Sequence, residues 1–368
     1  MTYKTRRMIR VAALGFLGFA FGVAGTAGTT VHPHAPAGVV GAMLDCSTAT
    51  FGGHPVGCEG EEWHGFQPDT AEHAYRIELE LVHTLDTLPG DPSSRHRGSS
   101  FVWLPPDHFA VVAPAMHGPE ISTYRVGGGL VAHRRTTGGG PGEFAGPISS
   151  VGGVGQTLMV IDGGGRAHTF LSDLTHLETR RMPVPLLHQT VLANGSIVGF
   201  APSRGEGGDR YMQHLIRAGR DGSLEIERSF GTATDQREEL RVAFATPDGG
   251  FWNHFPNFRN RLERHSSEAD HLRRVMVDRS EEGSSSAILE LPEGRLLLLT
   301  FVRDEERGGA ASTLLELVDP STGTVLATRH HPMPLQVVRN SGDLLRSSEE
   351  TEIGDTVFRI WRVRIQER

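Results

Sequence analysis

The chain has 368 residues and carries a formal net charge of −8 at pH 7. Its 46 glycines, its 21 prolines and a charged fraction of only 22% favour many tight turns and strands over long surface helices. Outside the first ten residues there is no basic stripe with interleaved aromatic residues, so the composition argues against a nucleic-acid-binding protein.

The N-terminus has four basic residues followed by an uncharged run from Val11 to about Gly28. This layout predicts that residues 1–28 are a secretory signal peptide. The run of 18 uncharged residues also reaches the lower limit for a retained membrane anchor, with residues 9–28 in contact with the inner membrane. Both alternatives stay open, and both predict an extracytoplasmic protein, either in the periplasm or secreted.

Residues 29–73 are poor in hydrophobic residues and rich in Gly, His, Pro and Thr, which predicts a tether. The tether holds the two cysteines of the chain, Cys46 and Cys58. In an oxidising compartment an isolated pair favours one disulfide. The alternative is a metal site that adds His54 and His64. Its spacing matches no CxxC or HxxxH pattern, so we predict a disulfide and no metal.

From residue 74 to residue 368 the sequence repeats a unit of four short strands. The most regular marks are six Gly-, Asn- or Asp-containing turns between the first and second strand of each unit, centred on residues 107, 154, 194, 248, 293 and 341. The second strands that follow are almost continuously apolar, as expected for strands buried between two neighbouring sheets. A repeat of 40 to 54 residues fits a four-stranded propeller blade.

The last unit lacks one strand, because six inner hairpins are accompanied by only five outer turns. The alternating segment Ala74–Leu85 precedes the first complete unit and can supply the missing strand. The sequence therefore predicts an all-β, six-bladed β-propeller, closed by an N-terminal strand that completes the last blade. A β-sandwich is the alternative, but a sandwich requires no repeat sustained over six units.

One unit of about 33 residues carries a more specific pattern. Its connecting turn runs from Gly138 to Pro147, a second strand ends in Asp162, and a third strand follows. This unit resembles a repeat of the NHL-type β-propeller family. The resemblance implies structural roles for the matching residues, with the Asp capping turn amides and pairing with the following Arg. The matching positions are Glu143, Phe144, Pro147, Asp162, Arg166 and Phe170.

Propellers of this kind include binding scaffolds as well as lactonases and lyases with a divalent metal in the channel. The metal enzymes need ligands from several blades, but the candidate ligands at second-strand ends here come from only two. The sequence has no Gly-x-Ser-x-Gly motif for a nucleophile. We therefore predict no catalytic residue and no cofactor, with Ca²⁺ or Zn²⁺ expected only under the alternative of a metal-dependent hydrolase or lyase.

The segment Phe251–Arg259 gathers aromatic, amide and basic side chains on one hairpin. Trp252 is expected to pack between blades, whereas Asn257, Arg259 and His254 are the candidate binding residues. The function predicted from the sequence is a non-catalytic binding or scaffold module. Its partner is expected to be a protein, with docking on the periplasmic face of a membrane complex as an accessory structural subunit the sharper hypothesis.

Overall fold

The computed structural model describes twelve parts of the chain. They are residues 50–51, 54–55, 74–85, 98–113, 118–135, 137–205, 208–233, 241–255, 261–277, 285–304, 310–350 and 356–368. Every structural statement below refers to these residues. The predicted signal or anchor, residues 1–28, lies outside them, and so do Cys46 and Cys58. No helix in the described parts is long and apolar enough to span a membrane.

The described residues form six four-stranded antiparallel sheets and one small hairpin. The hairpin pairs β1 (Thr50–Phe51) with β2 (His54–Pro55). Blades 1 and 2 comprise β4 (Ser100–Leu104), β5 (His108–Ala113), β6 (Glu120–Arg125), β7 (Leu130–Arg135), β8 (Ile148–Val154), β9 (Thr157–Asp162), β10 (Arg166–Phe170) and β11 (His176–Arg181). Blades 3 and 4 comprise β12 (Leu187–Val191), β13 (Ile197–Gly205), β14 (Gly208–Ala218), β15 (Leu224–Ala233), β16 (Val242–Ala245), β17 (Phe251–His254), β18 (Arg261–His265) and β19 (His271–Met276). Blades 5 and 6 comprise β20 (Ser285–Glu290), β21 (Leu296–Asp304), β22 (Ala310–Val318), β23 (Val325–His331), β24 (Gln336–Val337), β25 (Leu344–Glu350), β26 (Thr356–Glu367) and β3 (Tyr75–Leu85).

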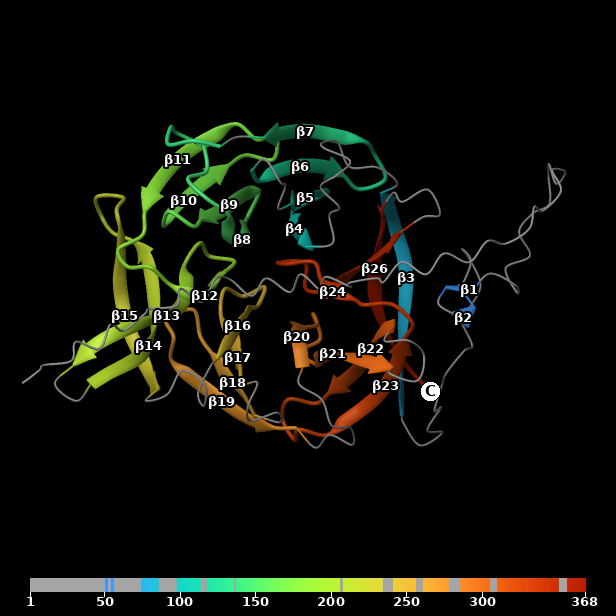
Figure 1. Cartoon of the computed structure of the whole chain (residues 1–368). Coiled ribbons are helices and arrows are strands. Elements are labelled where there is room, and N and C mark those ends of the chain that lie inside the picture. The colour runs from blue at the N-terminus through green and yellow to red at the C-terminus, as the bar shows by residue number, and fades with distance from the viewer. Residues whose placement is uncertain are drawn as a thin grey trace, which may run out of the picture. The chain divides into compact units, whose positions relative to one another are not determined.

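The six sheets stand in a ring, with the first strand of each blade innermost, as Figure 1 shows. The fold is a six-bladed β-propeller, and the sequence prediction of fold class is confirmed. The strand order in blade 6 is β24, β25, β26 and β3, so the N-terminal strand completes the last blade as predicted. Each of the six blades therefore has four strands.

The core is divided among the contacts between blades, which we call seams. Within the described residues there are six apolar clusters, and each joins one pair of neighbouring blades. Alternate residues of a strand serve opposite seams. In β4, for example, Val102 and Leu104 pack toward blade 2, whereas Phe101 packs toward blade 6. The almost continuous apolarity of the second strands follows from this arrangement, because both faces of each blade are buried.

The turn predicted around residue 154 begins later than expected. Gly152 and Gly153 lie within the inner strand β8, which continues to Val154. A Cβ atom on Gly152 would lie 2.6 Å from the Cβ of Val191, and one on Gly153 would lie 2.6 Å from the carbonyl oxygen of Trp103. Glycine is needed here because inner strands of neighbouring blades approach closely, which is a long-range requirement.

Candidate functional site

The connection from blade 1 to blade 2 is held by a hydrogen-bonded network around Asp162. The Oδ2 atom of Asp162 accepts a hydrogen bond from the amide of Ala145 at 2.8 Å, and Oδ1 accepts one from the amide of Arg166 at 2.9 Å. The Arg166 guanidinium lies 3.0 Å from Oδ2 and also donates to the carbonyl oxygens of Gly138, Gly139 and Glu143. These contacts fix the course of the turn.

The pKa of Asp162 shows how strongly the network favours the charged carboxylate. Burial alone would raise the pKa, because it disfavours the charged form. The hydrogen bonds from Ala145, Arg166 and His168 outweigh burial and lower the pKa below its ordinary value of 3.8. Asp162 is thus an ionised structural group, and its oxygens are engaged within the turn.

Glu143 also works inside the turn, since its Oε2 accepts a hydrogen bond from the amide of Gly140 at 2.8 Å. Phe144 follows and is only 1% exposed. It inserts into the seam between blades 1 and 2, in edge contact with the ring of His168. The turn is therefore anchored by one acid on its outside and one aromatic ring on its inside.

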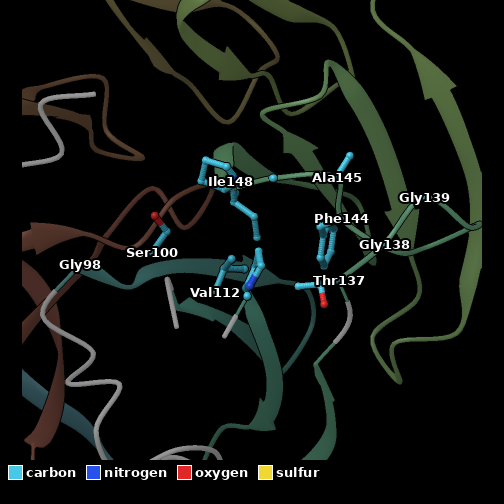
Figure 2. Close-up of a pocket in the computed structure, with 13 residues that line it drawn as sticks. Gly98, Ser100, Val112, Thr137, Gly138, Gly139, Phe144, Ala145 and Ile148 are labelled. Atoms are coloured by element: carbon cyan, nitrogen blue, oxygen red, sulfur yellow. The ribbon is translucent and has the colours of Figure 1, made fainter. Parts of the chain in front are cut away.

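Beside this turn lies a pocket of about 780 Å³. Blade 1 contributes Gly98, Ser100, Val112, Gly118 and Pro119, and the connection contributes residues 137–139 and 144–148. Figure 2 shows the pocket between the start of β4 and the turn that leads into β8. The volume falls in the range of sites that bind small molecules or peptide segments.

The wall of the pocket is made largely of backbone and apolar side chains. Five of its lining residues are glycines, and none of the lining residues is titratable. Ser100 and Thr137 supply the only side-chain hydroxyl groups among them. A Cβ atom built on Gly139 would meet no atom within 4 Å, so this position of the lining has room for a side chain. This chemistry suits recognition of an apolar group, and the described lining holds no titratable side chain that could activate the two hydroxyl groups.

A chain of hydrogen bonds behind the turn has the composition of a catalytic triad. The Nε2 atom of His168 lies 3.3 Å from Asp162 Oδ2, and its Nδ1 lies 3.0 Å from the hydroxyl of Thr179. The same hydroxyl lies 2.9 Å from Nε2 of His176. However, His168 is fully buried, and burial lowers its pKa.

The same type of pair recurs in other blades, which identifies its role. Ser122 and His133 are paired across β6 and β7 at 3.0 Å, and His214 and Ser229 are paired across β14 and β15 at 2.8 Å. A histidine and a hydroxyl residue thus face each other between the third and fourth strands of three blades. We interpret these pairs as cross-strand contacts that satisfy buried polar groups, because recurrence on a repeating scaffold indicates a structural role.

The candidate binding residues of blade 4 are only partly described. His254 lies at the end of β17 and is 1% exposed, while Asn257 and Arg259 lie outside the described residues. Trp252, 3% exposed, packs in the seam with blade 5, as predicted. Asn253 makes two reciprocal amide hydrogen bonds with Gln213 of blade 3, at 2.8 and 2.9 Å. The described part of this hairpin therefore joins blades.

Within the described parts of the chain, no three His, Cys, Asp or Glu side chains come together as a group that could hold a metal ion. Of the residues at second-strand ends that could serve as ligands, Asp162 belongs to the turn network and Asn253 is hydrogen-bonded to Gln213 of blade 3. Sequence reasoning did not single out the pocket itself. The glycine-rich turn could have indicated the pocket, but it was interpreted only as part of the propeller repeat.

Comparison with known proteins identifies the architecture. No protein-family model matches the sequence, and no curated protein is similar to it. Among solved structures, a candidate exported protein from Bacteroides fragilis NCTC 9343 is similar with a TM-score of 0.50 and 11% identity, covering 80% of this chain and 96% of that chain. A protein of unknown function from Dyadobacter fermentans DSM 18053 is similar with a TM-score of 0.43 and 10% identity, covering 78% of this chain and 99% of that chain. At such identities the similarity shows the fold alone, and the NHL resemblance stays a prediction.

Proposed function

We propose that this chain is a non-catalytic, extracytoplasmic binding module that holds a segment of a protein partner in the pocket between blades 1 and 2. The observation that carries the proposal is the lining of that pocket, which combines glycine backbone with apolar side chains and has no titratable group. A site for bond-breaking chemistry would need at least one positioned acid, base or nucleophile.

The shape of the pocket favours a peptide segment. Glycines at 98, 118, 138, 139 and 146 let a partner backbone approach closely, while Val112, Phe144 and Ile148 offer an apolar surface for a side chain. The wall is rigid on the side of the turn, because Asp162 and Arg166 fix it through charge-assisted hydrogen bonds. A preorganised wall reduces the entropic cost of binding.

The sequence adds the proposed location. A signal or anchor at residues 1–28 and a disulfide between Cys46 and Cys58 both fit an oxidising compartment outside the cytoplasm. The similarity to a candidate exported protein from Bacteroides fragilis agrees with this location. With the anchor retained, the propeller becomes an accessory subunit that docks on a membrane complex.

The test is native co-purification of the full-length chain from gently solubilised membranes, followed by quantification of partner stoichiometry. A Gly139→Leu variant places an apolar side chain at the pocket lining without a clash, because its added Cβ atom meets no atom within 4 Å and the backbone is not in the left-handed region. We expect a partner at fixed stoichiometry with the native chain and a loss of at least about tenfold with Gly139→Leu, since apolar burial in one pocket is worth a few kcal/mol.

The matched control is Gly129→Leu. Gly129 lies on the outer turn between β6 and β7, where an added Cβ also meets nothing within 4 Å. This variant should keep the partner. Recovery of a monodisperse monomer without any partner, or equal capture by both variants, would rule out the proposed site.

A further inference from the structure

The turn after β24 in blade 6 extends across the inner end of the ring. The amide of Arg339 donates to the carbonyl oxygen of Phe101, and its carbonyl accepts from the amide of Trp103, so the turn pairs with β4 of blade 1. A Cβ atom on Gly342 of the same turn would lie 3.3 Å from Pro247 of blade 4. A segment of blade 6 that contacts both blades 1 and 4 must lie close to the ring axis. Figure 1 shows the chain around β24 inside the ring.

Arg339 presents unused hydrogen-bond donors at this position. Its side chain donates to the carbonyl oxygen of Val151 on β8 at 2.9 Å. A guanidinium has five N–H groups, so most of these donors have no hydrogen-bond partner among the described residues. Among the described residues no carboxylate pairs with Arg339, and the residue as a whole is half-buried. Burial without a compensating charge lowers its pKa.

Asn340 stands next to it with a second unused donor. Its backbone adopts the left-handed conformation, with φ of 63°. The side-chain oxygen accepts a hydrogen bond from the amide of Gly153 at 2.9 Å. The Nδ2 atom is buried and has no hydrogen-bond partner in the structure. A buried amide nitrogen without a partner costs free energy that a ligand could recover.

The two side chains dock side by side on one strand edge. In a strand, the carbonyl of one residue and the amide two residues further point to the same side. Val151 and Gly153 have this spacing in β8, so Arg339 and Asn340 contact the same free inner edge. Their unspent donors therefore lie next to each other at the ring axis.

We propose that Arg339 and Asn340 form a binding site for a carboxylate group. The planar guanidinium matches a carboxylate in a two-point contact, and the Asn340 amide supplies one further donor. A carboxylate carries one negative charge, which balances the single charge of Arg339. The ligand is either a small organic acid or the C-terminal carboxylate of a peptide.

This site is independent of the pocket between blades 1 and 2. It can be tested on the purified full-length chain without any partner, by following thermal unfolding at pH 7 while sodium acetate replaces sodium chloride at constant ionic strength. We expect acetate to raise Tm in a saturable way, because a ligand that binds only the folded state stabilises it. The Arg339→Gln variant should weaken the apparent acetate affinity by at least about tenfold. Arg364→Gln, which removes an exposed arginine paired with Glu80, should leave it unchanged.

The variant Asn340→Asp keeps the proposal testable if Arg339→Gln does not fold. Aspartate has the same shape, tolerates the left-handed backbone and can still accept from the Gly153 amide. Its second oxygen would replace Nδ2 and act as an internal carboxylate for Arg339. We expect this variant to be more thermostable than the native chain without acetate, and to have lost the acetate response. An unchanged acetate response in both variants, or none in the native chain, overturns the proposal.

The two sources of the carboxylate are separated by a further titration. N-acetyl-dialanine carries a C-terminal carboxylate, and its amide derivative does not. Binding of the acid at least about tenfold tighter than acetate, with no effect of the amide, supports a peptide C-terminus as ligand. Affinity equal to that of acetate supports a small organic acid. Binding of the amide as tight as that of the acid contradicts a carboxylate site.

Discussion

The two seams on either side of blade 1 are built from the same sheet yet differ in how they are filled. Toward blade 2, the seam ends in the pocket beside the turn at Gly138 and Gly139. Toward blade 6, the corresponding space holds Arg346, which is 2% exposed. Its guanidinium lies over the rings of Phe101 and Phe358, at 4.8 and 5.5 Å from their centroids.

The difference follows from the side chains available at each seam. Arg346 donates to the carbonyl oxygen of Ser99 and to the side chain of Gln336, but among the described residues it has no carboxylate partner. Burial accordingly lowers the pKa of Arg346 to about 9. A long side chain fills the space beside Ser99 at the seam with blade 6, whereas the seam with blade 2 is packed by Phe144 and ends in a glycine-lined pocket. The first seam joins the first and last blades of the ring, and the second is where we propose that a ligand binds.

The largest effect on stability is expected at the seam between blades 1 and 6. Arg346→Ala should lower the free energy of unfolding by about 3–5 kcal/mol, because it leaves a cavity over the rings of Phe101 and Phe358 and removes the donor to Ser99. Arg346→Met keeps most of the volume and should cost about 1–2 kcal/mol. Urea unfolding followed by tryptophan fluorescence measures both. Equal losses would show that the charge, and not the packing, stabilises this seam.

A smaller loss of stability is expected when the pocket wall at the seam between blades 1 and 2 is changed. Asp162→Asn should cost about 2–4 kcal/mol at pH 7, because the new amide group faces the donors of Ala145 and Arg166. The pKa of Asp162 is lowered in the folded chain, so its contribution is complete above the unfolded value of 3.8 and is lost as the pH falls through the folded pKa.

Urea unfolding between pH 3 and pH 7 checks this dependence. The difference between the native chain and Asp162→Asn should be constant above about pH 5 and shrink below about pH 4. Asp173→Asn is the control, since Asp173 is exposed and an asparagine can still accept from the Thr175 amide. A difference that persists unchanged at pH 3 would show that Asp162 does not act through its charge.

The smallest effect separates two adjacent glycines of the pocket wall. Gly138 has φ of +152°, and an added Cβ would lie 2.3 Å from Glu143 Oε2, so Gly138→Ala should cost roughly 1–3 kcal/mol. Gly139 has neither restriction, and Gly139→Ala should stay within about 0.5 kcal/mol of the native chain. Urea midpoints of the two variants, measured side by side, test this; equal losses would contradict the open wall at Gly139.

The sequence predicted the architecture because the decisive signals are local. Six inner turns at regular spacing and the alternating strand before residue 86 were enough to predict the blades and the closure of the ring. The site was harder to predict, because it depends on contacts between distant residues. The need for glycine at 153 follows from its close approach to Trp103 of blade 1, which the sequence does not show. The position of Arg339 likewise follows from its contact with β8 of blade 2. The glycines of the connecting turn were recognised, but the space that they leave depends on how blade 1 faces them.

The closure of blade 6 also constrains the order in which the chain can fold. The strand β3 precedes the other strands of the propeller in the chain, and it pairs antiparallel with β26, which follows them, across a register shift at Ile360 and Trp361. The amide of Arg368 reaches the carbonyl oxygen of Ala74 at 3.0 Å. An emerging chain must therefore keep β3 unpaired until β26 is available, and contacts of such long sequence separation form slowly. A chain truncated before β26 would expose β3 as an edge for wrong pairing, so closure of the ring is coupled to the synthesis of β26.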